Sequence, residues 1–176
     1  SQLYHENKRG IKAGYAKYET FPIWNLPLKH PINLAYEAAT ADLNDVNMID
    51  SFHLSEYGKT AVNYNRDVQS FPVLKAILSK ITGKDIYKSP TDMGVNMIGE
   101  CIVRDDVVRK AATNEVIRRY YQAKVDYKKG KGTLETVTRI KLLMNELNVT
   151  GEDLDTVSAC LKKSKSENKN VLAIKL

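Results

Sequence analysis

Apolar residues recur at helical spacing along much of this chain. The segment FPVLKAILSKITG begins or kinks at Pro72 and ends at Gly83, and its apolar stripe consists of Val73, Leu74, Ile77, Leu78 and Ile81. A long helix is predicted from Asp105 to Lys129, where two nearby glycines would end it. Apolar residues then repeat from Leu134 to Leu147 with the period of an amphipathic helix. These patterns predict a mainly α fold of several helices.

Two shorter helices are predicted before that stripe. Pro31 suits the first position of a helix, and small side chains dominate the face formed by Leu34, Ala35, Ala38, Ala39 and Ala41. Such a face would let another helix approach closely. Asp50 is the expected cap of a helix from Ser51 to Tyr57, and Gly58 is its expected end.

Two further short helices are predicted later in the chain. Met93, Met97 and Cys101 are spaced four residues apart, which would place them on one face of a helix. Thr150 would begin the last helix, which is predicted to run to about Lys165. The polar stretch KKSKSENKN after it is typical of a solvated turn.

Strand signals occur only near the two ends of the sequence. Residues 1–10 are compatible with a helix that stops at Gly10, and the tyrosine-rich segment from Ile11 to Phe21 alternates as a strand does. Val171 to Leu176 is a second predicted strand. Because isolated strands are marginal alone, both indicate missing sheet neighbours. We therefore expect three parts: the end of an α/β domain over 1–30, a helical domain over 31–168, and the start of another α/β domain over 169–176.

Charge and cysteine content narrow the class of protein. The net charge is +6, but residues 37–100 carry 6 basic and 9 acidic side chains, so the positive surplus lies in the flanks. The two cysteines and three histidines are scattered, which argues against structural zinc and a disulfide framework. The sequence has neither a signal-peptide pattern nor an apolar run long enough for a membrane span. We expect a cytoplasmic protein that does not enter membranes.

Residues 40–67 form the most polar part of the chain. Their acidic and amide side chains could in principle hold Mg²⁺ or Ca²⁺, but an EF-hand loop would need Gly where Asn47 stands and Glu where His53 stands. No metal ligands are therefore assigned. The alternative role of these residues is helix capping and local hydrogen bonding to the backbone.

The run from Asn63 to Asp67 is the strongest candidate for chemistry. A guanidinium flanked by amides and a carboxylate, just before a helix, suits bidentate binding of a phosphate or carboxylate. His53 and Lys59 could add a proton-transfer group and a charge nearby. The alternative is a salt bridge of Arg66 within a rigid turn. Asp92 and Asn96 belong to a second polar segment, most of which helix initiation explains.

Other catalytic and binding patterns are absent or ambiguous. The chain lacks GxSxG, GxGxxG and GxxxxGK[ST], and His5-Glu6 cannot begin HExxH because Arg9 stands in the last position. The run RRYYQAKVDYKKGK could bind RNA through its bases and aromatic rings. Helical spacing favours the other interpretation, in which Tyr120, Tyr121 and Tyr127 face the core. Nucleic acid is thus not the expected partner.

Three blocks carry a family resemblance: YETFPIWNLPLKHPINLAYEAATADLNDVNMID, YGKTAVNYNRDVQSFPVLKAI, and YKSPTDMGVNMIG followed by VIRRYY. The chain resembles the bacterial family called domain of unknown function 1846, also called uncharacterised protein family 0371, over nearly its whole length. The resemblance implies that the chain is a central segment. A phosphate-loop-like GPGSGK segment would precede it, and an α/β domain would follow it. Residues 1–9 would then be the tail of the helix after that loop.

The family has no established reaction, so two functional hypotheses stay open. In the first, the chain is part of an enzyme that binds a nucleotide with Mg²⁺ or another phosphorylated small molecule. Its expected catalytic residues are His53, Lys59 and Asp67, and its expected ligand-binding residues are Asn63, Asn65, Arg66, Asp92 and Asn96. In the second, the chain is a helical scaffold or oligomerisation segment. The expected partners are the flanking domains, with a homo-oligomer and a small phosphorylated ligand as further candidates.

Overall fold

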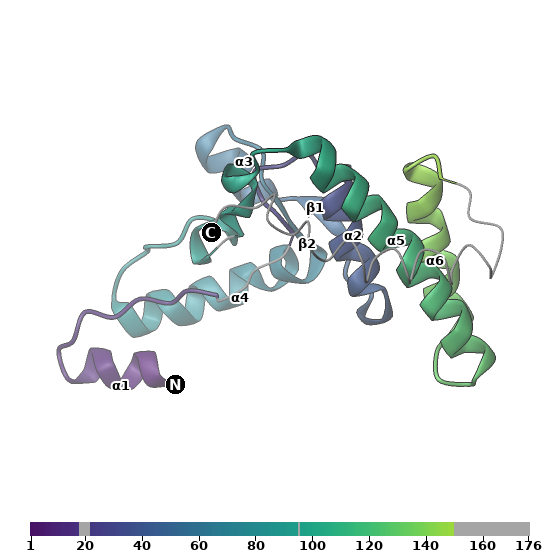
Figure 1. The fold of residues 1–176 in the computed structure, drawn as a ribbon. Helices are drawn as coiled ribbons and strands as arrows, with labels where there is room; N and C mark the ends of the chain where they lie inside the picture. Colours follow the sequence, from purple (N-terminus) through teal and green to yellow (C-terminus); the bar gives the residue numbers. More distant parts are fainter. Residues whose placement is uncertain (18–21, 95, 150–176) are drawn as a thin grey trace.

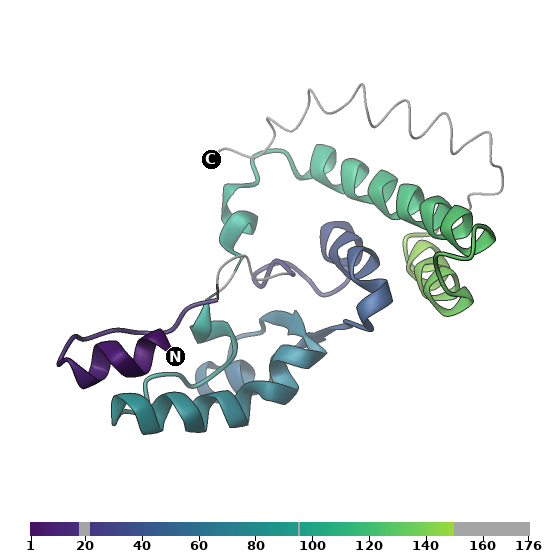
Figure 2. The same ribbon diagram turned by 90° about the horizontal axis from the view of Figure 1, so that it is seen from below.

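The computed structural model describes residues 1–17, 22–94 and 96–149, and its path is drawn in Figures 1 and 2. The mainly α fold is confirmed. In chain order the elements are α1 (Gln2–Lys8), α2 (Pro31–Ala39), the 3₁₀ helix η1 (Ala41–Leu43), β1 (Asn47–Ile49), α3 (Ser51–Tyr57), β2 (Val62–Tyr64), α4 (Asn65–Thr82), the 3₁₀ helices η2 (Thr91–Met93) and η3 (Met97–Cys101), α5 (Asp105–Lys128) and α6 (Leu134–Glu146). Helices α1 and α4 lie toward one end of the molecule, and α5 and α6 lie toward the other (Figure 1; Figure 2).

The larger apolar core lies where α2, α5 and α6 meet. Its buried members are Leu34, Ala35, Ala38, Ala41, Ala112, Val116, Tyr120, Tyr121, Val137, Ile140, Leu143 and Met144. The small residues of α2 face α5, as the sequence predicted, so the two backbones can approach closely. The expectation for Tyr120 and Tyr121 is confirmed, whereas that for Tyr127 is wrong: Tyr127 is 46% exposed, because the last turn of α5 extends beyond this core.

A two-stranded antiparallel sheet lies between the helical ends (Figure 1). It pairs β1 with β2 in the register Asn47 with Tyr64, Met48 with Asn63, and Ile49 with Val62. Helix α3 connects the two strands, and Asp50 caps it through bonds to the first-turn amides, as expected. The sequence predicted neither strand, since three residues are too few to display an alternating period.

The predicted strand from Ile11 to Phe21 is not formed over residues 11–17, and residues 18–21 lie outside the described chain. Instead of a strand ladder, the backbone of this segment uses single contacts. The amide and carbonyl of Tyr15 bond to the Tyr87 hydroxyl at 2.5 and 2.6 Å. The amide of Lys17 donates to the Met93 carbonyl at 2.6 Å. The second predicted strand, Val171 to Leu176, and the helix predicted from Thr150 to Lys165 also lie outside the described residues.

Met93 does not lie on one helix with Met97 and Cys101, contrary to the prediction. Met93 ends η2 and Met97 begins η3, and the chain between them turns at Gly94 with a φ of +121°. A Cβ at Gly94 would lie 2.5 Å from the carbonyl oxygen of Lys17, so only glycine fits there. This close approach helps to bring Met93 into the second apolar core, where Phe71, Leu78 and Tyr87 are buried.

Asn33 holds the proline-rich segment before α2 against the helix. It is 0% exposed, and its Oδ1 accepts from the amide of Ile23 at 2.8 Å. Its Nδ2 donates to the carbonyls of Ile23 and Pro27, both at 3.1 Å. The amide group therefore helps to satisfy buried backbone groups of Ile23 and Pro27.

Replacing Asn33 by Ala should lower the free energy of unfolding by about 2–4 kcal/mol, because it removes three hydrogen bonds, two of them buried, and leaves the amide of Ile23 without this acceptor. Urea unfolding would measure the change. The matched control is Asn145→Ala on the exposed side of α6, which should change stability by less than about 0.5 kcal/mol. Equal small effects in both variants would contradict the role given to Asn33.

Candidate functional site

The centre of the polar region is the carboxylate of Asp50, which is 0% exposed. Asp50 is a favoured residue at a helix N-terminus, because its side chain can accept from first-turn amides. Its Oδ1 accepts from the amides of Phe52 and His53, both at 3.0 Å. This half of the carboxylate therefore fixes the start of α3.

The other oxygen of Asp50 ties two distant segments to α3. Its Oδ2 accepts from the hydroxyl of Thr91 at 2.7 Å, from the amide of Thr91 at 3.1 Å, and from Nδ2 of Asn63 at 3.3 Å. Asn63 Nδ2 also donates to the Thr91 hydroxyl at 2.7 Å. The carboxylate thus accepts five hydrogen bonds from α3, β2 and η2. These donors account for its accepting capacity.

His53 lies beside this network but is not arranged as a base that activates a serine. Its Nδ1 lies 3.0 Å from Oγ of Ser89 and 4.0 Å from Oδ1 of Asp92, so both groups face the same ring nitrogen. A nucleophile and its orienting carboxylate must engage opposite nitrogens of the imidazole. In addition, Ser89 is 0% exposed and its Oγ accepts from the amide of Asp92. Together, His53, Ser89 and Asp92 stabilise a turn.

Asp92 uses its second oxygen in the same turn. Its Oδ2 accepts from the amides of Lys88 and Ser89 at 2.8 and 3.1 Å, and from the Tyr57 hydroxyl at 3.0 Å. The ring of His53 lies 4.7 Å from that of Tyr57 and 5.9 Å from that of Trp24, measured between centroids. Asp92 therefore connects the end of α3 to the segment before η2.

Arg66 and Asn65 lie at a second polar cluster, around Asp45. Arg66 Nη2 is 3.1 Å from Oδ2 of Asp45, whose side chain is 2% exposed, whereas the side chain of Arg66 is 63% exposed. Asn65 accepts from the amide of Val46 at 3.0 Å and donates to the carbonyl of Asn44 at 3.4 Å. This geometry matches the salt-bridge interpretation of Arg66, with Asn65 bonded to the backbone beside it.

A second arginine, Arg139 of α6, contacts the same cluster, although the sequence analysis did not identify it. Arg139 donates to the Asp45 carbonyl at 2.6 Å and to Oδ1 of Asn44 at 3.0 Å, and it lies 3.7 Å from Glu37. Glu37 Oε2 in turn accepts from the amide of Asn47 at 3.0 Å. Burial raises the pKa of Glu37, although the hydrogen bond from Asn47 and the charge of Arg139 oppose the rise.

The other predicted site residues are dispersed. Asp67 forms an ion pair with Lys17 at 2.5 Å. Asn96 accepts from the amide of Ile98 at 3.2 Å, and its Nδ2 lies 3.4 Å from the Tyr36 hydroxyl. Lys59 is exposed in the loop after α3. Of the predicted residues, His53 and Asn63 bond to Asp50, and Asp92 follows Thr91, which also bonds to it. Arg66 instead pairs with Asp45, and Asn65 bonds to the backbone on either side of Asp45.

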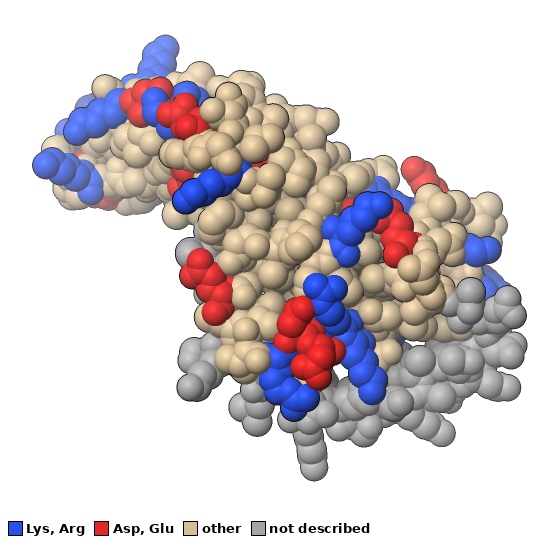
Figure 3. Space-filling model, turned by 90° about the horizontal axis from the view of Figure 1, so that it is seen from above, with Lys and Arg blue, Asp and Glu red and all other residues tan. Residues whose placement is uncertain are grey.

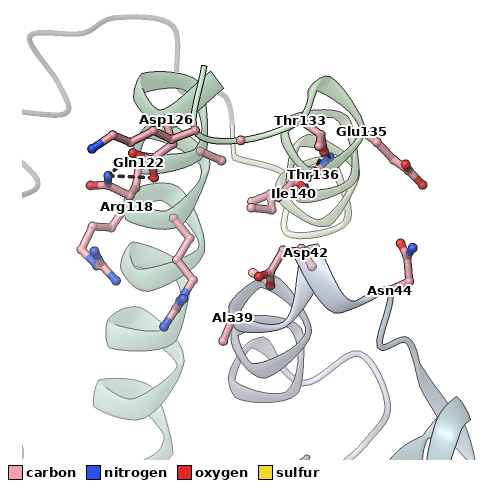
Figure 4. A pocket seen from close by; sticks show the side chains of 16 residues that line it. Ala39, Asp42, Asn44, Arg118, Gln122, Asp126, Thr133, Glu135, Thr136 and Ile140 are labelled. Atoms are coloured by element: carbon pink, nitrogen blue, oxygen red, sulfur yellow. Dashed lines mark hydrogen bonds between the residues drawn. The ribbon is translucent and has the colours of Figure 1, made fainter. Parts of the chain in front are cut away.

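A cavity of about 450 Å³ lies between η1, α5 and α6, away from all of these predicted residues. In Figure 4, Arg118, Gln122 and Asp126 extend from α5, with Gln122 bonded to Asp126, and the other helix carries Thr136 and begins after Thr133. Its charged lining residues are Arg118, Arg119, Lys131, Asp42, Asp126 and Glu135. Bases and acids are equal in number, so the lining has no net charge that would select a phosphate.

The surface of α5 carries alternating charges (Figure 3). Glu115 contacts both Arg118 and Arg119 at 2.7 and 2.8 Å, and Arg109 pairs with Asp105 at 2.5 Å. Burial would raise the pKa of Glu115, but Arg118 and Arg119 outweigh it and hold that pKa below its usual range. Within the described residues, no helix has the length and apolarity needed to cross a membrane.

Comparison with known proteins gives the family. Residues 1–148 match the model described as "Domain of unknown function DUF1846, N-terminal". The chain belongs to this family. It is 62% identical to a UPF0371 protein of Fusobacterium nucleatum over 93% of the chain and 32% of the relative. It is 59% identical to a UPF0371 protein of Clostridium botulinum (96% of the chain, 35% of the relative) and 56% identical to one of Streptococcus thermophilus (100% and 36%).

The chain spans about a third of the length of these curated relatives. The family resemblance inferred from the three sequence blocks is confirmed. The matches do not support the narrower inference of a central position in the longer chains, and it stays a prediction. The division into parts at residues 30 and 168 stays a prediction as well.

Replacing Asp50 by Ala should lower the free energy of unfolding by about 3 kcal/mol or more, because it removes five hydrogen bonds, four of them buried. Asp50→Asn keeps one acceptor oxygen and should have an intermediate effect. Both changes can be measured by chemical unfolding. Asp106→Asn is the matched control, since that side chain is 72% exposed. If the Asp50 variants lower the free energy of unfolding no more than Asp106→Asn does, the structural role given to Asp50 is wrong.

The buried Glu37 predicts a pH dependence. Because its pKa is raised in the folded chain, folding favours the protonated form, and stability is lost as the pH rises from the unfolded pKa, near 4.5, through the folded pKa. Glu37→Gln cannot ionise. Its stability relative to the unsubstituted protein should therefore increase between about pH 4 and about pH 7, as measured by urea unfolding.

Glu135→Gln serves as the control for this pH series, because Glu135 is exposed on α6. Its stability relative to the unsubstituted protein should stay nearly constant over the same interval. A relative stability of Glu37→Gln that falls toward neutral pH would mean that pairing with Arg139 outweighs the burial of Glu37.

Proposed function

We propose that this segment is a structural module of a longer protein, in which its polar residues hold the fold together. One observation carries the proposal: most of the predicted site residues contact segments that are far apart from them in the sequence. Asn63 joins β2 to Asp50 and Thr91, and Arg66 joins α4 to Asp45. A residue already used in this way has less capacity to bind a substrate.

The balance of charge supports the same proposal. Arg66 and Arg139 meet Asp45 and Glu37, and Lys17 meets Asp67. Each base among these residues has an acid within ion-pair distance, so little uncompensated positive charge is left to attract a phosphate. This module corresponds to the scaffold hypothesis, whose expected partners are the flanking parts of the same protein.

A second candidate function is the binding of a nucleotide or another phosphorylated small molecule at Arg66. The observation that favours it is the exposure of the Arg66 side chain, which is 63%, together with an ion pair that engages Nη2. A guanidinium edge that faces solvent can bind a phosphate through two parallel hydrogen bonds. A phosphate loop and Mg²⁺ would then come from the longer protein, with His53, Lys59 and Asp67 as the proposed proton-transfer and charged groups.

Thermal unfolding of the full-length protein distinguishes the two functions. The structural module predicts that Arg66→Ala lowers the unfolding midpoint by about 1 °C, the equivalent of about 1 kcal/mol in a chain about three times as long as this segment, because buried Asp45 loses an ionic partner. It also predicts that ATP, GTP and glucose 6-phosphate, each with Mg²⁺, leave the midpoint of the unsubstituted protein unchanged.

Arg109→Ala is the control, since Arg109 also pairs with an aspartate but is half exposed on α5. It should lower the midpoint less than Arg66→Ala does. A rise in the midpoint with one of the three ligands that disappears in Arg66→Ala would overturn the structural proposal and support the second candidate.

A further inference from the structure

The outward side of α4 carries a group of exposed apolar residues that we call the α4 apolar face: Pro72, Val73, Ala76 and Ile77. Val73 is 66% exposed and Ile77 is 51% exposed. Their spacing of three and four residues places them side by side on the helix. Helix α4 lies at the edge of the molecule, with α1 beside part of it (Figure 2).

The rest of α4 already has a buried side. Val68, Phe71 and Leu78 face the interior, so the α4 apolar face is a second apolar side on the same helix. A helix that meets solvent there would ordinarily carry polar residues. Valine and isoleucine are also weaker helix formers than the polar residues that could replace them. Neither local structure nor solvation accounts for these two side chains.

Basic residues stand at both ends of the α4 apolar face. Arg66 lies two turns before Val73 and Lys80 lies one turn after Ile77 along the same side of the helix, at spacings that continue through Gln69. The acidic residue of the first turn, Asp67, is directed instead to Lys17. The outward side of α4 therefore has an apolar centre, the cation of Lys80 at one end, and at the other end the solvent-facing part of the Arg66 guanidinium, whose Nη2 pairs with Asp45.

This charge pattern disfavours a second copy of the chain as the occupant. In a two-fold pair of antiparallel α4 helices, Arg66 of one copy would approach Lys80 of the other at both ends. In a parallel pair, Arg66 and Lys80 of one copy would each approach the same residue of the other copy. Like charges at both ends of an interface oppose association. An occupant with an apolar centre and acidic ends would complement the face.

We propose that the α4 apolar face packs against an amphipathic element of the same full-length polypeptide that lies outside this segment and has acidic residues at its ends. The family relatives supply such chain, since about two thirds of their length lies beyond the matched region. The proposal rests on the structural role proposed above and names the partner of that module.

Cysteine labelling of the full-length protein tests the contact. Val73→Cys and, as the control, Lys110→Cys on the exposed side of α5 are each made with Cys101→Ser and Cys160→Ser. Labelling by N-ethylmaleimide is timed in the native and the urea-unfolded protein, and light scattering gives the mass. After correction for the unfolded rate, we expect the cysteine at position 73 to react at least about 10-fold more slowly than that at position 110 in a monomeric protein, because burial blocks the reagent.

Two results would overturn the proposal. Equal labelling rates at positions 73 and 110 would show that the α4 apolar face is open in the full-length protein. Protection of position 73 that appears only when the protein is oligomeric, and disappears on dilution to the monomer, would assign the face to a second copy. Neither result bears on the Arg66 thermal test, so this proposal can fail while the structural role of the module stands.

Discussion

The burial of one carboxylate, that of Asp50, is the constraint on which the arrangement of the polar region depends. An ionised carboxylate removed from water is costly unless several donors replace its hydration. Here the first turn of α3, Asn63 of β2 and Thr91 of η2 supply those donors. Three short elements thereby take fixed positions relative to one another. In the proposed structural module, the same bonds that position these elements occupy donors and acceptors that could otherwise bind a ligand.

The helices could be predicted because their signals are local. The predicted ends of the long helix and of the last described helix agree with α5 and α6 to within a residue. Helix α4 begins earlier than Pro72, at Asn65, because a proline costs one backbone hydrogen bond and does not prevent a helix that packs well on both sides of it. The strands escaped prediction for a different reason. Each has three residues, which is too short for an alternating hydrophobic pattern, and the sequence does not show which segments pair.

The site was harder to predict than the fold, because amides and carboxylates look alike in sequence whether they bind a ligand or another part of the chain. Asp50 was recognisable as a helix cap, yet nothing in its spacing indicated Asn63 and Thr91 as partners. The ion pair of Arg66 was anticipated as an alternative, but its acceptor, Asp45, was not. Arg139 joins Asp45 from 94 residues away, and such a contact has no local signal.

Taken together, the contacts describe a segment whose polar residues are part of its stable core. Binding loops belong to the regions of a protein that open at low free energy, whereas core elements open only on global unfolding. Native-state hydrogen exchange of the full-length protein would test this difference most directly at the amides of Phe52, His53 and Thr91, which donate to Asp50. We predict that they exchange with the same free energy and denaturant dependence as the amide of Val116, at the centre of α5. Exchange at a free energy lower by about 2 kcal/mol or more, without denaturant dependence, would contradict this account.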